Sequence, residues 1–222
     1  MTDYITPRQF DEAEGVEDWR LLSEGATAFF RTHSFAESAR FVQAICELDG
    51  VEAHRPSIDV RHDGVTVHLI TYTEDYFGPS QRDVALARQI SAVAQKMGLS
   101  ADPTVVQSLL IIPGASDITS VMPFWRTVLG YEPRRDSPDE DLVDPQNWGP
   151  AFWFEQMDEP RGDGGGAIHI ALWVPYEQAE ARIEAALAAG GRMVRDDFAP
   201  AWWTLADAAG NEVDIATVKT RD

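Results

Sequence analysis

The residues best suited to proton transfer lie between His54 and Asp83. An imidazole has a reference pKa of about 6.5 and exchanges protons near pH 7, so His54 is the candidate acid or base. Arg55 keeps its charge at any ordinary pH and could instead bind a carbonyl or hydroxyl group. Tyr72 has a reference pKa of about 10, so forming its phenolate at pH 7 costs about 4 kcal/mol. It therefore suits proton donation or stacking better than proton removal.

A hairpin followed by a helix is expected to position these side chains. An Asp-Gly pair at 63–64 separates two alternating apolar runs, as in two antiparallel strands joined by a two-residue turn. His54 precedes the first strand, and Tyr72 follows the second. Ser80 and Asp83 form a capping pair that opens the next helix. The pattern thus predicts that the start of a sheet and the start of a helix together hold the ionisable groups.

Each of these residues also has an ordinary structural role. His54 could be a loop histidine bound to backbone, and Arg55 could be a solvated surface side chain. Tyr72 could be packing at a strand end, and the cap alone would explain Asp83. Two-residue alternation places His62 and His68 on the Tyr72 side of the hairpin. His62 could supply a further imidazole, although the turn should put it at the opposite end.

The spacing in this stretch resembles the pterin-4a-carbinolamine dehydratase family. The pattern of that family is His-His-Pro, five residues, an aromatic, nine residues, a third His, and later an Asp at a helix start. His54, Pro56 and Asp83 match in both type and spacing. Three further positions match in spacing only: the second His, the aromatic and the third His are Arg55, His62 and Tyr72.

The resemblance implies a hydro-lyase that removes water from 4a-hydroxytetrahydrobiopterin and requires no cofactor. Such a reaction delivers one proton to the leaving hydroxyl and removes another from a ring nitrogen, which suits imidazoles. Two of the three imidazoles are replaced, so we expect a retained pocket with weakened turnover. The implied catalytic positions are His54 and Tyr72, and the implied substrate-binding positions are Arg55, Pro56, His62, Arg82 and Asp83.

Composition predicts a two-domain globular protein. The chain has 222 residues and a net charge of −19, which should repel phosphate backbones and anionic lipid heads. We therefore expect no nucleic-acid or membrane partner. Cys46 is the only cysteine, so an internal disulfide is excluded; it falls on the apolar side of a helical pattern and is expected in the core. With no apolar N-terminal leader, a cytoplasmic location is expected.

The first domain is expected to span 1–99, with an α+β fold of four antiparallel strands and two long helices. Ser34 and Glu37 form a capping box before the first helix. Its expected apolar face is Phe35, Ala39, Val42, Ile45 and Leu48. The second helix begins at Ser80 and ends near Gly98, and residues 99–103 then form a short polar linker.

The second domain, expected at 104–222, shows an internal repeat. A strand at 104–112, a helix at 118–129 and three short strands are followed by the same order from 164 onward. This arrangement of paired βαβββ modules resembles the vicinal-oxygen-chelate fold of glyoxalases, extradiol dioxygenases and bleomycin-resistance proteins. Its best local matches are FWRTVLGYE (124–132), HIALWV (169–174) and DAAGNEVDI (207–215).

Metal-dependent members of that fold take one ligand from each of four strands. Carried over by position, the resemblance implies a divalent metal held by Gln107, Glu155, His169 and Asp214. Such a set of nitrogen and oxygen ligands would suit zinc, nickel, manganese or iron. However, Gln156 fits the second position equally well, and a lone histidine in an apolar strand is more often part of a core.

Three functions therefore remain open from the sequence. The leading one is a pterin-carbinolamine-dehydratase-like lyase fused to a glyoxalase-like domain. A second is a metal-dependent lyase or dioxygenase acting in the C-terminal domain. A third is a non-catalytic binder of a planar small molecule, because the second domain holds six of the seven tryptophans. Both resembled families often form dimers, so a homodimer is also expected.

Overall fold

The chain folds as two compact units in the computed structural model, which describes residues 3–157, 168–206 and 212–220. The first unit comprises Met1–Tyr72, Phe77–Gln107 and Val218–Asp222, and the second comprises Thr73–Tyr76 and Ser108–Thr217. Residues 100–107 thus group with the first unit. The C-terminal segment also returns to it, since Lys219 Nζ donates to Asp11 Oδ2 at 2.5 Å.

The first unit is built on an antiparallel sheet. The strands β1 (Arg20–Leu22), β2 (Gly25–Arg31), β4 (Gly64–Leu69) and β3 (Ser57–Arg61) lie in that order. This confirms the expected α+β fold with its four-stranded sheet. A short additional strand, β7 (Ser100–Ala101), pairs with β2 beyond the predicted end of the domain.

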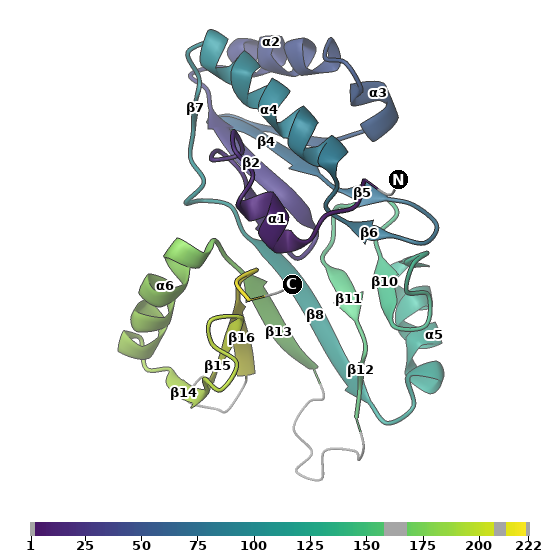
Figure 1. The fold of residues 1–222 in the computed structure, drawn as a ribbon. Helices are drawn as coiled ribbons and strands as arrows, with labels where there is room; N and C mark the ends of the chain where they lie inside the picture. The colour runs from purple at the N-terminus through teal and green to yellow at the C-terminus, as the bar shows by residue number, and fades with distance from the viewer. Residues whose placement is uncertain (1–2, 158–167, 207–211, 221–222) are drawn as a thin grey trace. The chain divides into compact units, whose positions relative to one another are not determined.

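Two long helices, α2 (Phe35–Cys46) and α4 (Gln81–Lys96), lie over one face of this sheet (Figure 1). Alternate residues of β4 point into the core that they cover, and Val65 and Val67 are fully buried there. The rings of Phe30 and Phe41 meet edge to face with centroids 5.1 Å apart. The helices therefore bury one sheet face and leave His68, which alternates with Val67, on the other.

Two details of α2 differ from the expected helical face. Phe35 is 62% exposed, whereas Phe41 is fully buried and Ile45 lies beside it in the core. Cys46 is exposed, so its expected core position is wrong. The buried stripe of the helix instead runs through Ser38, Phe41 and Ile45, so the face that meets the sheet is rotated from the expected one.

Several short elements were not expected from the sequence. They are the helix α3 (Val51–His54) and the paired strands β5 (Thr71–Tyr72) and β6 (Phe77–Gly78). None is long enough to show a hydrophobic period. The short helix α1 (Pro7–Asp11) agrees with the sequence, in which residues 1–17 allow a short helix with Pro7 near its start.

The second unit consists of two βαβββ modules that form one sheet, as expected. The strand order is β14-β15-β16-β13-β8-β11-β10-β9, with β12 pairing β8. The first module contains β8 (Ser108–Ala115), α5 (Ile118–Leu129), β9 (Glu132–Pro133), β10 (Asp141–Val143), β11 (Ala151–Trp153) and β12 (Glu155–Gln156). The second contains β13 (Ile168–Trp173), α6 (Tyr176–Ala188), β14 (Arg192–Arg195), β15 (Trp202–Ala206) and β16 (Glu212–Ala216).

The two modules repeat each other in strand pairing. In each module, the first strand runs parallel to the third strand after the helix. In the first module β8 pairs with β11, and in the second β13 pairs with β16. The first strands of the two modules then pair antiparallel, and Ala171 lies opposite Leu110. Each helix covers its own half of the sheet, α5 over Phe152 and α6 over Ile215.

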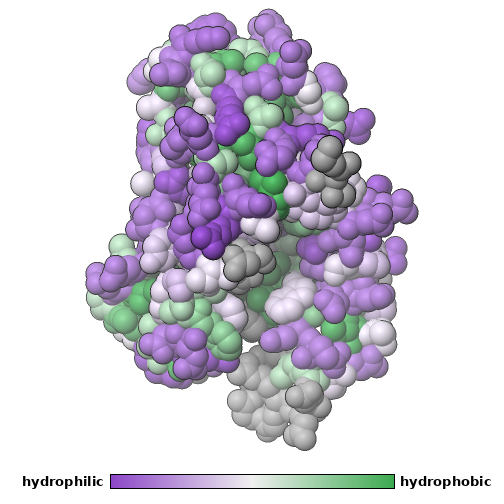
Figure 2. Space-filling model, in the orientation of Figure 1, coloured by the Kyte–Doolittle hydropathy of each residue, from purple (hydrophilic) through white to green (hydrophobic). Residues whose placement is uncertain are grey.

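The viewed surface of the first unit is mainly hydrophilic. Figure 2 shows mostly hydrophilic residues over the helices of the first unit, with only scattered apolar side chains. Within the described residues, no helix combines the length and apolar character that crossing a membrane would require.

Gly25 provides a test of the close packing between β2 and β4. Its φ is +127°, and an added Cβ would lie 2.4 Å from the backbone oxygen of Leu69. We expect Gly25→Ala to lower the free energy of unfolding by at least about 3 kcal/mol, because backbone must move. Gly98→Ala is the matched control: its φ is +72° but an added Cβ meets nothing within 4 Å.

In Gly98→Ala the free energy of unfolding should fall by only about 1–2 kcal/mol, because a residue with a side chain is strained in the left-handed conformation by about that amount. Urea denaturation followed by circular dichroism measures both variants. Equal losses would show that backbone conformation alone, rather than the close approach of the two strands, demands glycine at position 25.

Candidate active site

A short helix and a left-handed turn hold His54 in place. The helix α3 follows Gly50, whose φ is +87°, and ends at Arg55, whose φ is +57°. The backbone N–H of Arg55 donates to the Val51 oxygen at 2.7 Å. Left-handed backbone costs a residue with a side chain about 1–2 kcal/mol. The turn reverses the chain from α3 into β3 and leaves the Arg55 side chain exposed.

The first turn of α4 supplies the partner of His54. Ser80 is the N-cap of this helix, and its backbone N–H donates to Asp83 Oδ2 at 2.6 Å. Its hydroxyl in turn accepts from the backbone N–H of Arg82 at 3.2 Å. This confirms the predicted capping pair and fixes the Asp83 carboxylate at the start of the helix.

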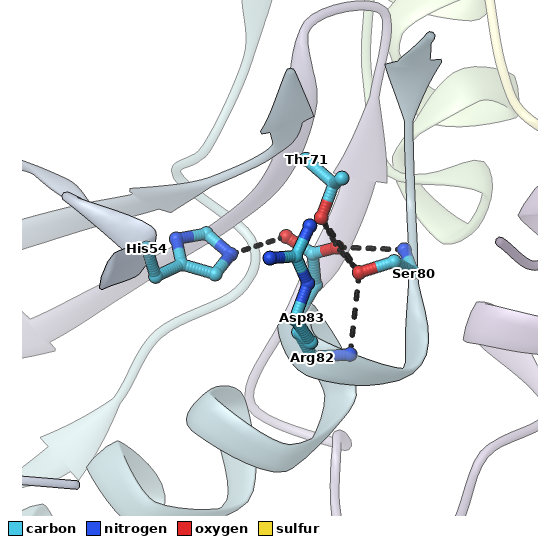
Figure 3. A network of polar contacts seen from close by, with 5 residues as sticks. All are labelled: His54, Thr71, Ser80, Arg82 and Asp83. Carbon is cyan, nitrogen blue, oxygen red and sulfur yellow. Dashed lines mark hydrogen bonds and ion pairs between the residues drawn. The ribbon is translucent and has the colours of Figure 1, made fainter. Parts of the chain in front are cut away.

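The central contact joins His54 to Asp83. His54 Nε2 lies 2.7 Å from Asp83 Oδ1, and the two side chains are only 7% and 1% exposed. On the other oxygen, Oδ2 accepts from the hydroxyls of Thr71 at 2.7 Å and Ser80 at 2.6 Å. Figure 3 shows these groups converging on the carboxylate from α3, β5 and α4. Both carboxylate oxygens are therefore occupied.

These contacts decide the charge of Asp83. Burial acts to raise its pKa, but the hydrogen bonds from His54, Ser80 and Thr71 outweigh burial, and the pKa is lowered. Asp83 is thus a carboxylate at pH 7 and can only accept hydrogen bonds. The hydrogen between the two groups must lie on His54 Nε2. When His54 is neutral, its Nδ1 therefore carries the lone pair.

His54 Nδ1 is buried and has no hydrogen-bond partner within the described ranges. A buried polar atom left without a partner costs about 1–3 kcal/mol. Such atoms are rare in native proteins and often mark a catalytic or ligand-binding role. The ring is therefore held by one nitrogen and offers the other for chemistry.

Tyr72 and the remaining binding candidates lie on the elements beside this pair. Tyr72 follows Thr71 in β5, is 42% exposed, and meets the ring of Phe77 edge to face at 5.8 Å. Arg82 lies beside Asp83 in the first turn of α4 and is exposed, and Pro56 is half-buried next to Arg55. Arg55, Pro56 and Arg82 thus neighbour the His54–Asp83 pair along the chain, and Tyr72 follows Thr71, which donates to Asp83.

His62 is not brought to this pair. It lies in the turn between β3 and β4, beyond the pairing of Arg61 with Gly64, and its side chain is 85% exposed. Its Nδ1 is 3.6 Å from Asp63 Oδ1. His54 instead precedes Ser57, the first residue of β3, which lies at the opposite end of the β3–β4 pairing.

His68 is the residue that sequence reasoning did not select. It is half-buried on β4, where Ser57 and Thr27 lie opposite on the two neighbouring strands. Burial lowers its pKa, and the His54 charge acts in the same direction. A hydrogen bond with the Glu24 backbone and the Asp83 charge oppose this shift. Only strand alternation, which placed His68 on the Tyr72 side, could have indicated it.

The implied metal ligands of the second unit do not converge. Gln107 precedes β8, whereas Glu155 pairs with Gly114 near the opposite end of that strand. Seven residues of extended chain span about 23 Å at about 3.3 Å per residue. Metal–ligand bonds are about 2.0–2.2 Å long, so these two residues cannot share an ion.

The described side chains agree with the separation of Gln107 from Glu155. Asp214 Oδ1 accepts from the Thr204 hydroxyl at 2.6 Å on the neighbouring strand. The side chain of His169 lies outside the described part of the structure. Among the side chains that are described, no three His, Cys, Asp or Glu residues lie close enough to share an ion. The residues present therefore do not fit a four-ligand metal site.

The tryptophans of the second unit divide between the two sheet faces. Trp125 and Trp203 pack on the helix side, and Trp148 is 90% exposed. By register, the opposite face holds Trp153, Trp173 and Trp202. Trp202 stacks on Phe198 with centroids 4.2 Å apart.

The charge of Asp83 can be tested through stability against pH. A carboxylate with a lowered pKa stabilises the fold above its unfolded pKa of about 3.9, and that stabilisation is lost as pH falls through the folded pKa. We expect Asp83→Asn to lower the free energy of unfolding by about 1–3 kcal/mol at pH 7, because buried donors lose their acceptor. The difference from the parent should shrink as pH falls from 5 toward 3.

Asp59→Asn is the matched control, because Asp59 pairs with Arg61 on the exposed surface at 2.7 Å. Exposed pairs contribute about 0–1 kcal/mol, so this variant should change little. Urea denaturation at several pH values measures both. A deficit in Asp83→Asn that is the same at pH 3 and pH 7 would contradict a charged Asp83.

Metal content provides the test for the second unit. Protein dialysed against zinc, nickel or manganese and then against metal-free buffer should retain well under one ion per chain, because the donor atoms do not converge. His169→Ala should retain the same amount. Stoichiometric metal in the parent that is lost in this variant, measured by mass spectrometry of the elements, would overturn the geometric argument.

Comparison with known families agrees with both units. Residues 4–93 match the family described as pterin 4 alpha carbinolamine dehydratase, and residues 110–216 match the glyoxalase-like domain family. The first match includes the whole stretch from His54 to Asp83. The second includes both βαβββ modules.

Individual relatives match the first unit alone, and each is named a putative pterin-4-alpha-carbinolamine dehydratase. The protein of Thermomicrobium roseum is 29% identical over 36% of this chain and 83% of its own length. That of Acidobacterium capsulatum is 28% identical over 40% and 96%, and that of Chloroflexus aurantiacus is 32% identical over 34% and 80%. The chain therefore belongs to the pterin-4-alpha-carbinolamine dehydratase family through its first unit, which is fused to a glyoxalase-like domain.

Proposed function

We propose that the first unit is a hydro-lyase of the 4a-hydroxytetrahydrobiopterin dehydratase type with reduced turnover. The observation that carries this proposal is the buried His54–Asp83 pair, at 2.7 Å, with His54 Nδ1 left without a partner. The family match supplies the reaction class, and the relatives' names supply the pterin carbinolamine substrate. No cofactor enters this scheme.

In this proposal His54 is the acid. Loss of water requires a proton on the departing hydroxyl, and a neighbouring carboxylate stabilises the imidazolium that carries it. Asp83 holds Nε2, so the proton is transferred from Nδ1. That atom is covered in the ligand-free protein, so neighbouring side chains must shift when substrate binds. Catalytic contacts commonly tighten only in the complex.

Arg55 and Tyr72 bind rather than exchange protons. The guanidinium of Arg55 is always charged and donates hydrogen bonds, so it can hold a pterin carbonyl or the departing hydroxyl. Its side chain is exposed at the left-handed turn that follows α3. Tyr72 already packs one ring edge on Phe77 and exposes the rest, which suits stacking on a planar ring.

A dehydration assay with 4a-hydroxytetrahydrobiopterin tests the proposal. We expect weak turnover in the parent and a further loss of about 10²–10⁴-fold in His54→Ala, the usual contribution of an acid–base group. Tyr72→His should raise the rate if the pocket is intact, because it restores an imidazole at that position. His62→Ala, in the exposed turn, should change nothing.

Full activity in His54→Ala would remove His54 from the mechanism. Absence of any pterin binding, measured by calorimetry with the parent, would refute the pocket itself. Binding without turnover in both the parent and Tyr72→His would reassign the unit from enzyme to binder.

The second candidate function lies in the glyoxalase-like unit. By register, Trp153, Trp173 and Trp202 share the sheet face opposite the helices. Trp153 is 37% exposed there while Trp173 is buried, and an exposed indole suits contact with a planar ligand. Because the expected ligand set does not converge, we propose binding without metal chemistry for this unit. Quenching of tryptophan fluorescence by a pterin, lost in Trp153→Phe but kept in Trp148→Phe, would favour it.

A further inference from the structure

A second imidazole, that of His68, is connected to the His54–Asp83 pair by two short stretches of chain. His68 pairs with Ser57, which follows His54 by three residues, and Thr71, a hydrogen-bond donor to Asp83, follows His68 by three. Both paths run through the end of the sheet where β3 begins and β4 ends. His68 is thus tied by backbone pairing to the same end of the fold as the pair.

The backbone of strand β2 lies against the His68 ring. Gly25, on the neighbouring strand β2, has φ +127°, and a Cβ added there would lie 3.1 Å from His68 Nε2. Glycine therefore allows the imidazole to rest against the strand backbone. The residues directly opposite His68, Thr27 and Ser57, carry no charge.

Both members of the pair act on the proton affinity of His68. Asp83 favours a proton on His68, whereas His54 and burial disfavour one. Interacting groups of this kind titrate as a set, because a proton on one changes the affinity of the others. At pH 7 the balance leaves His68 neutral and able to accept a proton.

We propose that His68 is the second proton-exchanging imidazole of the site, working together with the His54–Asp83 pair. This rests on the proposed function. His54 gives its proton to the hydroxyl, which leaves as water with the electron pair of the C–O bond. The electron pair of a ring nitrogen forms the new C=N bond, and the proton released from the ring passes to His68. Transfer of a proton through solvent from His68 to His54 then resets the site.

Neither Tyr72 nor His62 is suited to accept the proton released from the ring. The Tyr72 phenol exchanges protons poorly at pH 7, and His62 lies in the exposed turn at the far end of the hairpin. His68 is therefore the half-buried imidazole that is neutral at pH 7 and electrostatically linked to His54.

Titration tests the link without any need for turnover. In the full chain with isotope-labelled histidine, the His68 resonance is assigned with His68→Gln and followed against pH. We expect its midpoint to rise in His54→Gln, which removes a repelling charge, and to fall in Asp83→Asn, which removes an attracting one. His33→Gln, on the exposed surface, should leave it unchanged.

If one of His54→Gln and Asp83→Asn fails to fold, the His68 midpoint in the other is enough for the test. A His68 midpoint that stays fixed in a folded His54→Gln or Asp83→Asn protein would overturn the proposal. That result would stand whether or not the protein turns over pterins, so it is distinct from failure of the proposed function.

Activity gives the second readout. His68→Gln should lower the rate by about 10²-fold or more and remove one limb of its pH profile. Adding Tyr72→His to that variant should restore part of the rate, because a new imidazole then replaces the lost one. A His68→Gln protein with an unchanged pH profile would contradict a proton-transfer role, since a purely structural change would lower the rate alike at all pH values.

Discussion

The hydrogen bond between His54 and Asp83 is the interaction on which the first unit's chemistry depends. It joins α3 to the first turn of α4, two elements that have no regular pairing with each other. A carboxylate can be buried only if its oxygens are satisfied, and here two hydroxyls, a backbone N–H and an imidazole do so. The same hydrogen bond from His54 that helps to satisfy the Asp83 carboxylate also orients the imidazole ring.

This arrangement reuses a device whose ordinary purpose is to start a helix. Asp83 closes the capping box with Ser80 through one oxygen and holds His54 through the other. Thr71 brings the end of the hairpin into the same cluster, where its hydroxyl lies 2.6 Å from that of Ser80. A change at any of these positions would therefore affect helix capping, sheet docking and the orientation of the imidazole together.

The two units differ in how much of their expected chemistry the residues support. The first keeps a buried acid–base pair while the imidazole positions beside it are filled by Arg55 and Tyr72. In the second, the repeat of the βαβββ module is visible in its strand pairing, yet Gln107 and Glu155 lie near opposite ends of β8 and cannot share an ion. A fold can therefore be present where the residues do not fit the expected site.

The sequence by itself determined the α+β class, the βαβββ repeat, the cap at Ser80 and the spacing from His54 to Asp83. Each follows from local rules: hydrophobic period, turn residues and capping pairs act within a few positions of the chain. The buried stripe of α2 and the exposure of Cys46 escaped those rules, because they depend on how the helix is rotated against the sheet.

Only the tertiary structure decided which side chains meet. The contact of His54 with Asp83 spans 29 positions, the role of His68 depends on strand register, and the separation of Gln107 from Glu155 depends on where β12 pairs with β8. Such contacts are set by how strands align and helices dock, and no local pattern of residue types encodes that alignment.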